Sequence, residues 1–249
     1  MVTLISDLDS TLIYPRQPNY HIVEFFEGRP ISWMTKKASD TLNRLLINPG
    51  FQLIPCTLRS FEQTMRVEFL KKHPPKYMIC DDGASIYVDG ILDENYQSYL
   101  REHNILKFDM VREMKGILEE ATHTYVKDNR MTFLVVMYPN HEIAIAHVEQ
   151  VKELMKDYPV LVERQGRKIY VLPHGLGKEV AVKYMIDVMG INPTFTSGDG
   201  FVDDEFVKLG ETQLVPGHAA YHHPAKMKTT GIMAGEKILL EVERSMESA

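Results

Sequence analysis

The sequence predicts an α/β protein whose core is built on a parallel sheet and carries an inserted α+β domain. Near both ends of the chain, short apolar runs alternate with amphipathic stretches, which is typical of right-handed βαβ units. The middle instead carries neighbouring strands joined by tight turns. At 249 residues the chain has room for one or two domains and can bury a core without disulfides or a structural metal.

The first part of the core alternates strands and helices. The apolar run 2–6 stops at Asp7, as a strand buried on both faces would. Thr35 has the character of a helix N-cap, because apolar residues follow it at helical spacing. The expected elements are the strand 2–6, a hairpin formed by 21–26 and 31–34, a helix from Thr35, the strand 51–56, a helix over 61–72 and the strand 77–80.

The pattern changes after Gly83. Asp89-Gly90 and Gln165-Gly166 are turn signals between apolar runs, so each predicts a β-hairpin. The expected elements of this block are a hairpin over 85–92, helices over 95–103 and 109–122, a β-rich run over 131–138, a helix over 142–156 and a hairpin over 160–172. We therefore expect an inserted domain over 84–168 between core segments 1–83 and 169–249. The expected elements of the second core segment are helices over 178–189 and 203–209 and strands over 194–197 and 213–215.

Composition excludes several classes of protein. Hydrophobic residues make up 44% and charged residues 25%, which is ordinary for a globular protein, and a net charge of −6 argues against a nonspecific nucleic-acid binder. No run reaches the roughly 18 apolar residues of a membrane span. The first residues have no basic region and too short an apolar run for a signal peptide, so we expect none, and Cys56 and Cys80 are too few for a disulfide framework. We expect a cytoplasmic protein, and the sequence leaves its oligomeric state open.

Acidic and polar side chains follow the predicted core strands. Asp7 and Asp9 come after the first strand, Thr57 follows the strand 51–56, and Gly198-Asp199 follows the strand 194–197. Ligands of open α/β sheets bind at the carboxyl ends of the strands, and Mg²⁺ prefers oxygen ligands together with a substrate phosphate. Each motif alone also fits a plainer role: surface carboxylates in a turn, an N-cap at Thr57 or Ser60 for the helix that begins at Phe61, or an Asx turn in which Asp204 caps the next helix.

Lys178 begins a predicted helix, where a cation is unfavourable for the helix dipole. A phosphate or carboxylate neighbour would explain this placement, and a solvated surface lysine is the simpler alternative. His218, His222 and His223 match no zinc-binding spacing, so we interpret them as loop residues.

The order Asp7-Leu8-Asp9-Ser10-Thr11, Thr57, Lys178 and Gly198-Asp199 with Asp203 resembles the four motifs of the haloacid dehalogenase (HAD) superfamily of phosphohydrolases. The insert lies where this superfamily carries its type II cap domains. The run 168–178 is similar to the corresponding passage of the subgroup that contains sucrose-phosphate phosphatase, mannosyl-phosphoglycerate phosphatase and phosphomannomutase. Leu58 and Val202 depart from the subgroup's usual Gly and Asn, which leaves the metal coordination and the subfamily open.

The resemblance implies a Mg²⁺-dependent phosphatase with a Rossmann-like core that acts on a small phosphorylated metabolite, such as a sugar phosphate. It implies Asp7 as nucleophile, Asp9 as acid and base, and Thr57 and Lys178 as phosphate ligands. Mg²⁺ would be held by Asp7, by Asp199 and by the carbonyl of Asp9. Asp203 would orient Lys178 or a metal-bound water. We count all four aspartates as candidate metal residues. Arg59 and Arg164 are candidate substrate contacts, together with Arg167 and Lys168. A phosphomutase of the same fold and a non-catalytic binding protein are the alternatives.

Overall fold

The computed structural model describes residues 1–247 and divides into two compact units. Unit 1 comprises residues 1–96 and the chain from Gly177 onward, and unit 2 comprises Gln97–Leu176. The expected insert began at residue 84, but the hairpin that follows Gly83 belongs to unit 1 in the structure. The reason is that the first strand of this hairpin pairs with a strand of unit 1, so the chain passes into unit 2 only beyond Tyr96.

The sheet of unit 1 has the strand order β13-β12-β1-β4, and all three pairings are parallel. Its strands are β1 (Val2–Ser6), β4 (Phe51–Pro55), β12 (Phe195–Ser197) and β13 (Thr212–Gln213). Beyond β4, Cys56 forms a parallel bridge to Ile79 of β5 (Tyr77–Cys80). There the direction changes, because β5 pairs antiparallel with β6 (Ser85–Val88), which turns back into β7 (Ile91–Leu92).

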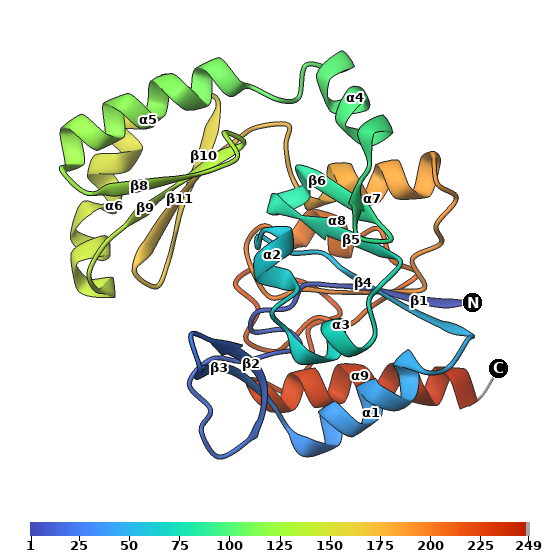
Figure 1. Cartoon of the computed structure of the whole chain (residues 1–249). Coiled ribbons are helices and arrows are strands. Elements are labelled where there is room, and N and C mark those ends of the chain that lie inside the picture. Colours follow the sequence, from blue (N-terminus) through green and yellow to red (C-terminus); the bar gives the residue numbers. More distant parts are fainter. Residues whose placement is uncertain (248–249) are drawn as a thin grey trace. The chain divides into compact units, whose positions relative to one another are not determined.

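Helices cover both faces of this sheet (Figure 1). The helices of unit 1 are α1 (Lys36–Leu46), α2 (Phe61–Thr64), α3 (Glu68–Lys72), α7 (Lys178–Asp187), α8 (Asp204–Val207) and α9 (Ile232–Glu247), and the short 3-10 turn η1 spans Asp81–Gly83. The boundary between the units falls within α4 (Glu94–Glu102). The single helix expected over 61–72 is wrong. Val67 has an extended backbone and bridges Glu24, so the segment forms two short helices.

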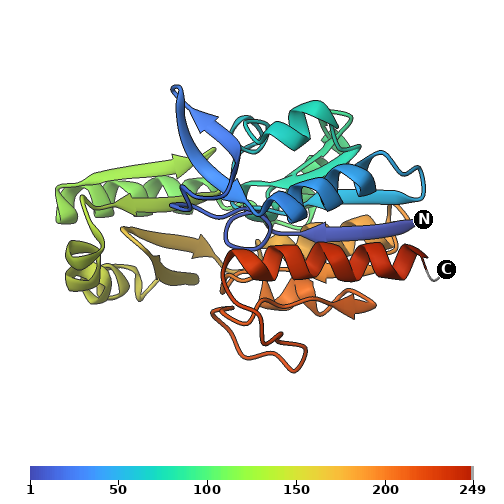
Figure 2. The same ribbon diagram turned by 90° about the horizontal axis from the view of Figure 1, so that it is seen from below.

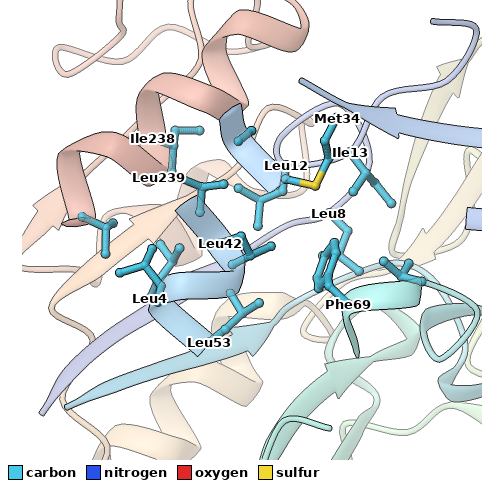
Figure 3. Close-up of a cluster of buried hydrophobic side chains, with 14 of the residues drawn as sticks. Leu4, Leu8, Leu12, Ile13, Met34, Leu42, Leu53, Phe69, Ile238 and Leu239 are labelled. Atoms are coloured by element: carbon cyan, nitrogen blue, oxygen red, sulfur yellow. The ribbon is translucent and has the colours of Figure 1, made fainter. Parts of the chain in front are cut away.

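The main core of unit 1 lies between the sheet and the helices α1 and α9. Leu4 of β1 and Leu53 of β4 point toward Leu42 of α1 and toward Ile238 and Leu239 of α9 (Figure 3). The two helices lie side by side beneath the sheet (Figure 2). The side chain of Thr35 accepts a hydrogen bond from the backbone N–H of Ala38, which confirms it as the N-cap of α1.

The predicted hairpin after the first strand is present as β2 (His21–Phe26) and β3 (Arg29–Met34). Its pairing is irregular on both sides of Glu24, which is the signature of a β-bulge. A regular strand would direct Val23 and Glu24 to opposite faces, but here both are buried. The bulge therefore turns a carboxylate into the protein.

Unit 2 is an antiparallel sheet with the strand order β10-β11-β9-β8. Its elements are α5 (Phe108–Thr122), β8 (Tyr125–Asn129), β9 (Phe133–Met137), α6 (His141–Met155), β10 (Val160–Gln165) and β11 (Lys168–Pro173). Both helices pack against the side chains that alternate on one face, such as Val136, Val162 and Ile169. The three helices expected in the insert are present as α4, α5 and α6, and the closing hairpin is confirmed, while β8 lies outside the predicted β-rich run. Within residues 1–247, no helix combines the length and the apolar character that crossing a membrane requires.

Candidate active site

The motifs that follow β1, β4 and β12 end at one edge of the sheet. These three strands are adjacent and parallel, with β1 in the centre, so their carboxyl ends meet. Asp7 directly follows β1 and Thr57 lies just beyond β4, while Asp199 follows β12 after Gly198. The backbone N–H of Asp7 donates to the carbonyl of Ser197 at 2.9 Å, which joins two of the motifs directly.

Lys178 is the buried cation of this edge. Its Nζ lies 2.7 Å from Oδ1 of Asp7 and 2.6 Å from Oδ1 of Asp203, and its side chain is 1% exposed. Burial lowers the pKa of Lys178, but the neighbouring carboxylates of Asp203 and Asp7 outweigh this effect and hold the pKa well above its usual range. The solvated-lysine alternative is therefore wrong, and Lys178 connects motifs that lie far apart in the sequence.

Asp7, Asp199 and Asp203 form a buried acidic cluster in which one ligand atom from each carboxylate lies within 4.8 Å of the others. Burial raises the pKa of Asp7 well above its usual range against the opposing effect of Lys178, and the other carboxylates raise it further. Burial, followed by the charge of Asp203, raises the pKa of Asp199 to about 7. Closely packed carboxylates with raised pKa values fit a hard divalent cation, which would stabilise their ionised form.

Hydrogen bonds hold the outer members of the acidic cluster. The hydroxyl of Thr11 donates to Oδ1 of Asp199 at 2.9 Å, and the backbone N–H of Gly200 donates to Oδ2 of Asp203 at 2.7 Å. Asp203 itself occupies the N-cap position of α8, so the expectation that Asp204 caps this helix is wrong. Asp204 instead pairs with Lys208 on the following turn.

Among the described residues, the acidic cluster consists of Asp7, Asp199 and Asp203, and the side chain of Asp9 is not part of it. Its carboxylate, 46% exposed, is held by Arg59, whose Nε and NH2 atoms each lie 2.6 Å from one of its oxygens. The proposed metal contact of Asp9 was through its backbone carbonyl and stays a prediction. Arg59 was expected to contact substrate, but the structure directs its donors to Asp9, to Glu24 and to the carbonyl of Gln63.

Thr57 lies beside this pair and is buried. Its hydroxyl oxygen accepts a hydrogen bond from the backbone N–H of Arg59 at 3.2 Å. Of the two N-cap candidates, Ser60 is confirmed, because it caps α2 in a capping box with Gln63, and Thr57 is not the cap. Thr57 thus remains available for the phosphate-binding role that the sequence predicts.

The turn η1 was not anticipated as part of this region. Its residues Asp81, Asp82 and Gly83 have φ values of +54°, +55° and +84°. A Cβ at Gly83 would lie 2.1 Å from the carbonyl oxygen of Gly177, so only glycine lets η1 approach the start of α7. Asp82 is buried, and burial raises its pKa well above the usual range, with Lys178 opposing. The Asp-Asp-Gly sequence after a strand was the available signal.

Arg164 lies in unit 2, on β10. Its NH1 donates to the carbonyl of Gly166 at 2.9 Å, and in the sheet it pairs with Ile169. Cross-strand partners share a face, and Ile169 belongs to the apolar cluster under the helices. Arg164 therefore stands on the helix-covered face, whereas Lys168 and Tyr170 alternate to the other face.

The late histidines do not form a zinc site among the described residues, where the one cluster of three potential ligands contains only aspartates. His218 Nδ1 accepts from the backbone N–H of Gly231, so Nε2 is the donor to the carbonyl of Ser10 at 2.8 Å. Cys56 and Cys80 are both buried, as expected for core thiols.

Comparisons with known proteins agree with this geometry. The family model of sucrose-6F-phosphate phosphohydrolase matches residues 1–228. Among solved structures, the sucrose-phosphatase from Synechocystis sp. PCC6803 in complex with sucrose and phosphate is 18% identical, with a TM-score of 0.61 over 97% of this chain and 98% of that one. The C-terminal domain of the C. albicans trehalose-6-phosphate phosphatase is 15% identical, with a TM-score of 0.61 over 98% and 92%.

A haloacid dehalogenase-like hydrolase from Bacillus subtilis is 14% identical, with a TM-score of 0.53 over 96% of this chain and 91% of that one. No match was found among curated protein sequences. The structural likenesses establish the HAD fold, and the family model spans most of the chain. The protein therefore belongs to the sucrose-6F-phosphate phosphohydrolase family and is a phosphoric monoester hydrolase with the HAD fold.

Proposed function

We propose that the protein is a Mg²⁺-dependent phosphatase that hydrolyses a small sugar phosphate or related monoester through an aspartyl-phosphate on Asp7. The observation that carries this proposal is the ion pair of Lys178 with Asp7 and Asp203, next to Asp199 at the carboxyl end of the sheet. A buried nucleophile, a fixed cation and a set of hard oxygen ligands are the groups that phosphoryl transfer requires.

In the first step, a carboxylate oxygen of Asp7 attacks phosphorus in line, and the bond from phosphorus to the sugar oxygen breaks. Asp9 gives a proton to the departing alkoxide. Lys178 holds phosphate oxygens and offsets charge in the transition state, and Asp203 fixes the ammonium 2.6 Å away. The hydroxyl of Thr57 donates to a further phosphate oxygen.

In the second step, Asp9 takes a proton from water, which attacks the phosphorus of the aspartyl-phosphate and restores Asp7. Asp7 and Asp199, with the carbonyl of Asp9, would hold Mg²⁺, and Asp203 lies close enough to contribute. When bound, the ion supplies positive charge that stabilises the phosphoryl oxygens.

We propose that unit 2 selects the ester. The groups of unit 1 bind the phosphate and transfer it to Asp7, and these steps are common to all monoesters, so they do not distinguish one alcohol from another. The face of its sheet opposite the helices carries Lys168 and Tyr170, which are polar groups suited to a sugar. Of the candidate substrate contacts in unit 2, Arg164 shares the helix-covered face with Ile169, so we favour Lys168 as the specificity residue.

A panel of phosphorylated metabolites, with detection of released phosphate, tests the proposal. We expect turnover with Mg²⁺, loss of turnover in EDTA, and recovery when Mg²⁺ is added back. Asp7→Asn should fold and form no phosphoenzyme. Full activity in metal-free buffer, or retained activity in Asp7→Asn, would contradict the mechanism.

The same panel separates the phosphatase from a phosphomutase. A mutase would return the phosphoryl group to another hydroxyl of the sugar, so an isomeric sugar phosphate would accumulate and little free phosphate would appear. A protein that binds the esters with no product of either kind would support the non-catalytic alternative.

A further inference from the structure

Glu24 is a carboxylate with no exposed surface that lies on the β2–β3 hairpin. It accepts hydrogen bonds from NH1 of Arg59 at 2.9 Å, NH2 of Arg59 at 3.0 Å, Nε of Arg66 at 3.2 Å and the hydroxyl of Ser32 at 2.6 Å. Four hydrogen bonds match the roughly four acceptor sites of an ionised carboxylate. Glu24 is therefore buried as a fully satisfied anion.

The local structure places Glu24 there at a cost. Burying an ion is unfavourable unless its partners are well oriented, and packed apolar residues often hold two elements together equally well. The β-bulge at Glu24 breaks the regular pairing of the hairpin so that this carboxylate points inward beside Val23. This combination indicates a role beyond attaching the hairpin to unit 1.

Arg59 transmits the position of Glu24 to Asp9. The guanidinium has five N–H donors, and each has an acceptor: Nε bonds Asp9, NH1 bonds Glu24 and the Gln63 carbonyl, and NH2 bonds both Asp9 and Glu24. In this arrangement no donor of Arg59 is left for a substrate. Glu24 on one edge of the planar group and Asp9 on the other fix it from both sides.

We propose that Glu24 is a positioning residue that, through Arg59, sets the orientation of the Asp9 carboxylate for proton transfer. The inference rests on the proposed function, in which Asp9 protonates the leaving oxygen. Proton transfer requires hydrogen-bond geometry between the acid and that oxygen, so a carboxylate that can swing freely loses catalytic effect. The structure supplies the restraint from a hairpin that lies outside the HAD motifs identified in the sequence.

The test compares two esters that differ in their need for an acid. A sugar phosphate or simple alkyl phosphate has a poor leaving group that needs a proton, whereas p-nitrophenyl phosphate releases a stable anion. The measured quantity is kcat/KM, which covers the steps up to departure of the alcohol. We expect Glu24→Gln and Arg59→Lys to lower kcat/KM for the alkyl ester by about tenfold or more, within the range of lost acid catalysis, and for p-nitrophenyl phosphate by about twofold or less.

Arg66→Met is the matched control. Arg66 also bonds Glu24 and lies over the ring of Phe26, 4.8 Å from its centroid, but the structure gives it no contact with Asp9. We expect this variant to lose stability without changing the ratio of the two kcat/KM values. The fluorescence of Trp33, which lies in β3 of the same hairpin, reports whether each variant keeps the fold. If Glu24→Gln does not fold, Arg59→Lys carries the test.

Asp9→Asn separates failure of the inference from failure of the proposed function. If Asp9→Asn lowers kcat/KM equally for both esters, Asp9 is not the acid, and the proposed role and the inference both fall. If Asp9→Asn discriminates between the esters but Glu24→Gln and Arg59→Lys do not, the inference alone is overturned. A rise in KM for both esters in Arg59→Lys, with weaker inhibition by inorganic phosphate, would return Arg59 to substrate binding and also overturn it.

Discussion

Replacing Lys178 by Met should destabilise unit 1 strongly. The side chain is 1% exposed and its ammonium pairs with two carboxylates, at 2.7 Å to Asp7 and 2.6 Å to Asp203. Removing one partner of a buried ion pair costs about 3–5 kcal/mol, since the remaining charge is left uncompensated. A change of 1 kcal/mol shifts the melting temperature by roughly 2–4 °C at this size, so we expect Tm to fall by about 6–20 °C.

Guanidinium unfolding in EDTA measures this effect, because the only tryptophan of the chain, Trp33, lies in unit 1 and reports on that unit. Lys208→Met is the matched control. Lys208 pairs with Asp204 and Glu205 but is 47% exposed, and such surface pairs contribute at most about 1 kcal/mol. If the two variants lose equal stability, Lys178 does not compensate buried charge and this reasoning is wrong.

Turnover gives an independent measurement on the same Lys178 variants. Lys178→Met should reduce kcat by about 10²-fold or more, the scale of losing one preorganised donor to transition-state charge. Lys178→Arg should restore part of it, because a planar fork cannot reproduce a compact ammonium. Wild-type kinetics in the methionine variant would remove Lys178 from the phosphate site.

Three further predictions concern pH, backbone and specificity. In metal-free protein the pKa of Asp199 is about 7, above its usual value of 3.8, so the free energy of unfolding should fall as pH rises toward 7. Mg²⁺ should therefore raise Tm more at pH 8 than at pH 6 in a thermal-shift assay. Gly83→Ala should lower the free energy of unfolding more than Gly166→Ala, whose added methyl meets no atom within 4 Å. Lys168→Ala should change the preferred ester, measured by relative kcat/KM, whereas Arg164→Ala should not.

The sequence was sufficient for the parallel core strands and their carboxyl edge, because apolar runs that end in acidic or hydroxyl residues mark that edge, but it did not predict the strand order or the antiparallel pairing of β5 with β6. Asp7 and Asp199 were found this way. The position of Lys178 followed from motif order, but its burial did not, since the Asp7 partner is 171 residues away. A lone lysine at a helix start looks the same whether it is solvated or paired.

Other parts of the structure were beyond the reach of these patterns. The sequence predicts the strand that contains Glu24 but gives no signal that this carboxylate is buried, because its burial depends on the bulge and on partners from other elements. The helix α9 was missed although Ile238, Leu239 and Val242 have helical spacing and belong to the core. Arg59 is a cation next to a phosphate-binding motif in the sequence, which suggested substrate binding. In the structure its N–H groups instead donate to the carboxylates of Asp9 and Glu24, which are distant in sequence.

The charges of unit 1 separate into two groups with different requirements. When Asp9 is ionised, as it is between the two proposed steps, the anions Asp9 and Glu24 face the cations Arg59 and Arg66, so the charge of this network is balanced within the protein. Within residues 1–247, Lys178 pairs with Asp7 and Asp203, and His218 Nε2 lies 4.0 Å from Asp199. With His218 neutral, as its hydrogen bonds indicate, the three ionised carboxylates and Lys178 leave two negative charges. A divalent cation would balance that excess. Without the cation, binding of protons reduces the negative charge instead, which is what the raised pKa values of Asp7 and Asp199 express. A phosphate dianion approaching the metal-free cluster would add to this excess, so under the proposed function the ion would act before any bond changes, by lowering the repulsion between the site and the ester.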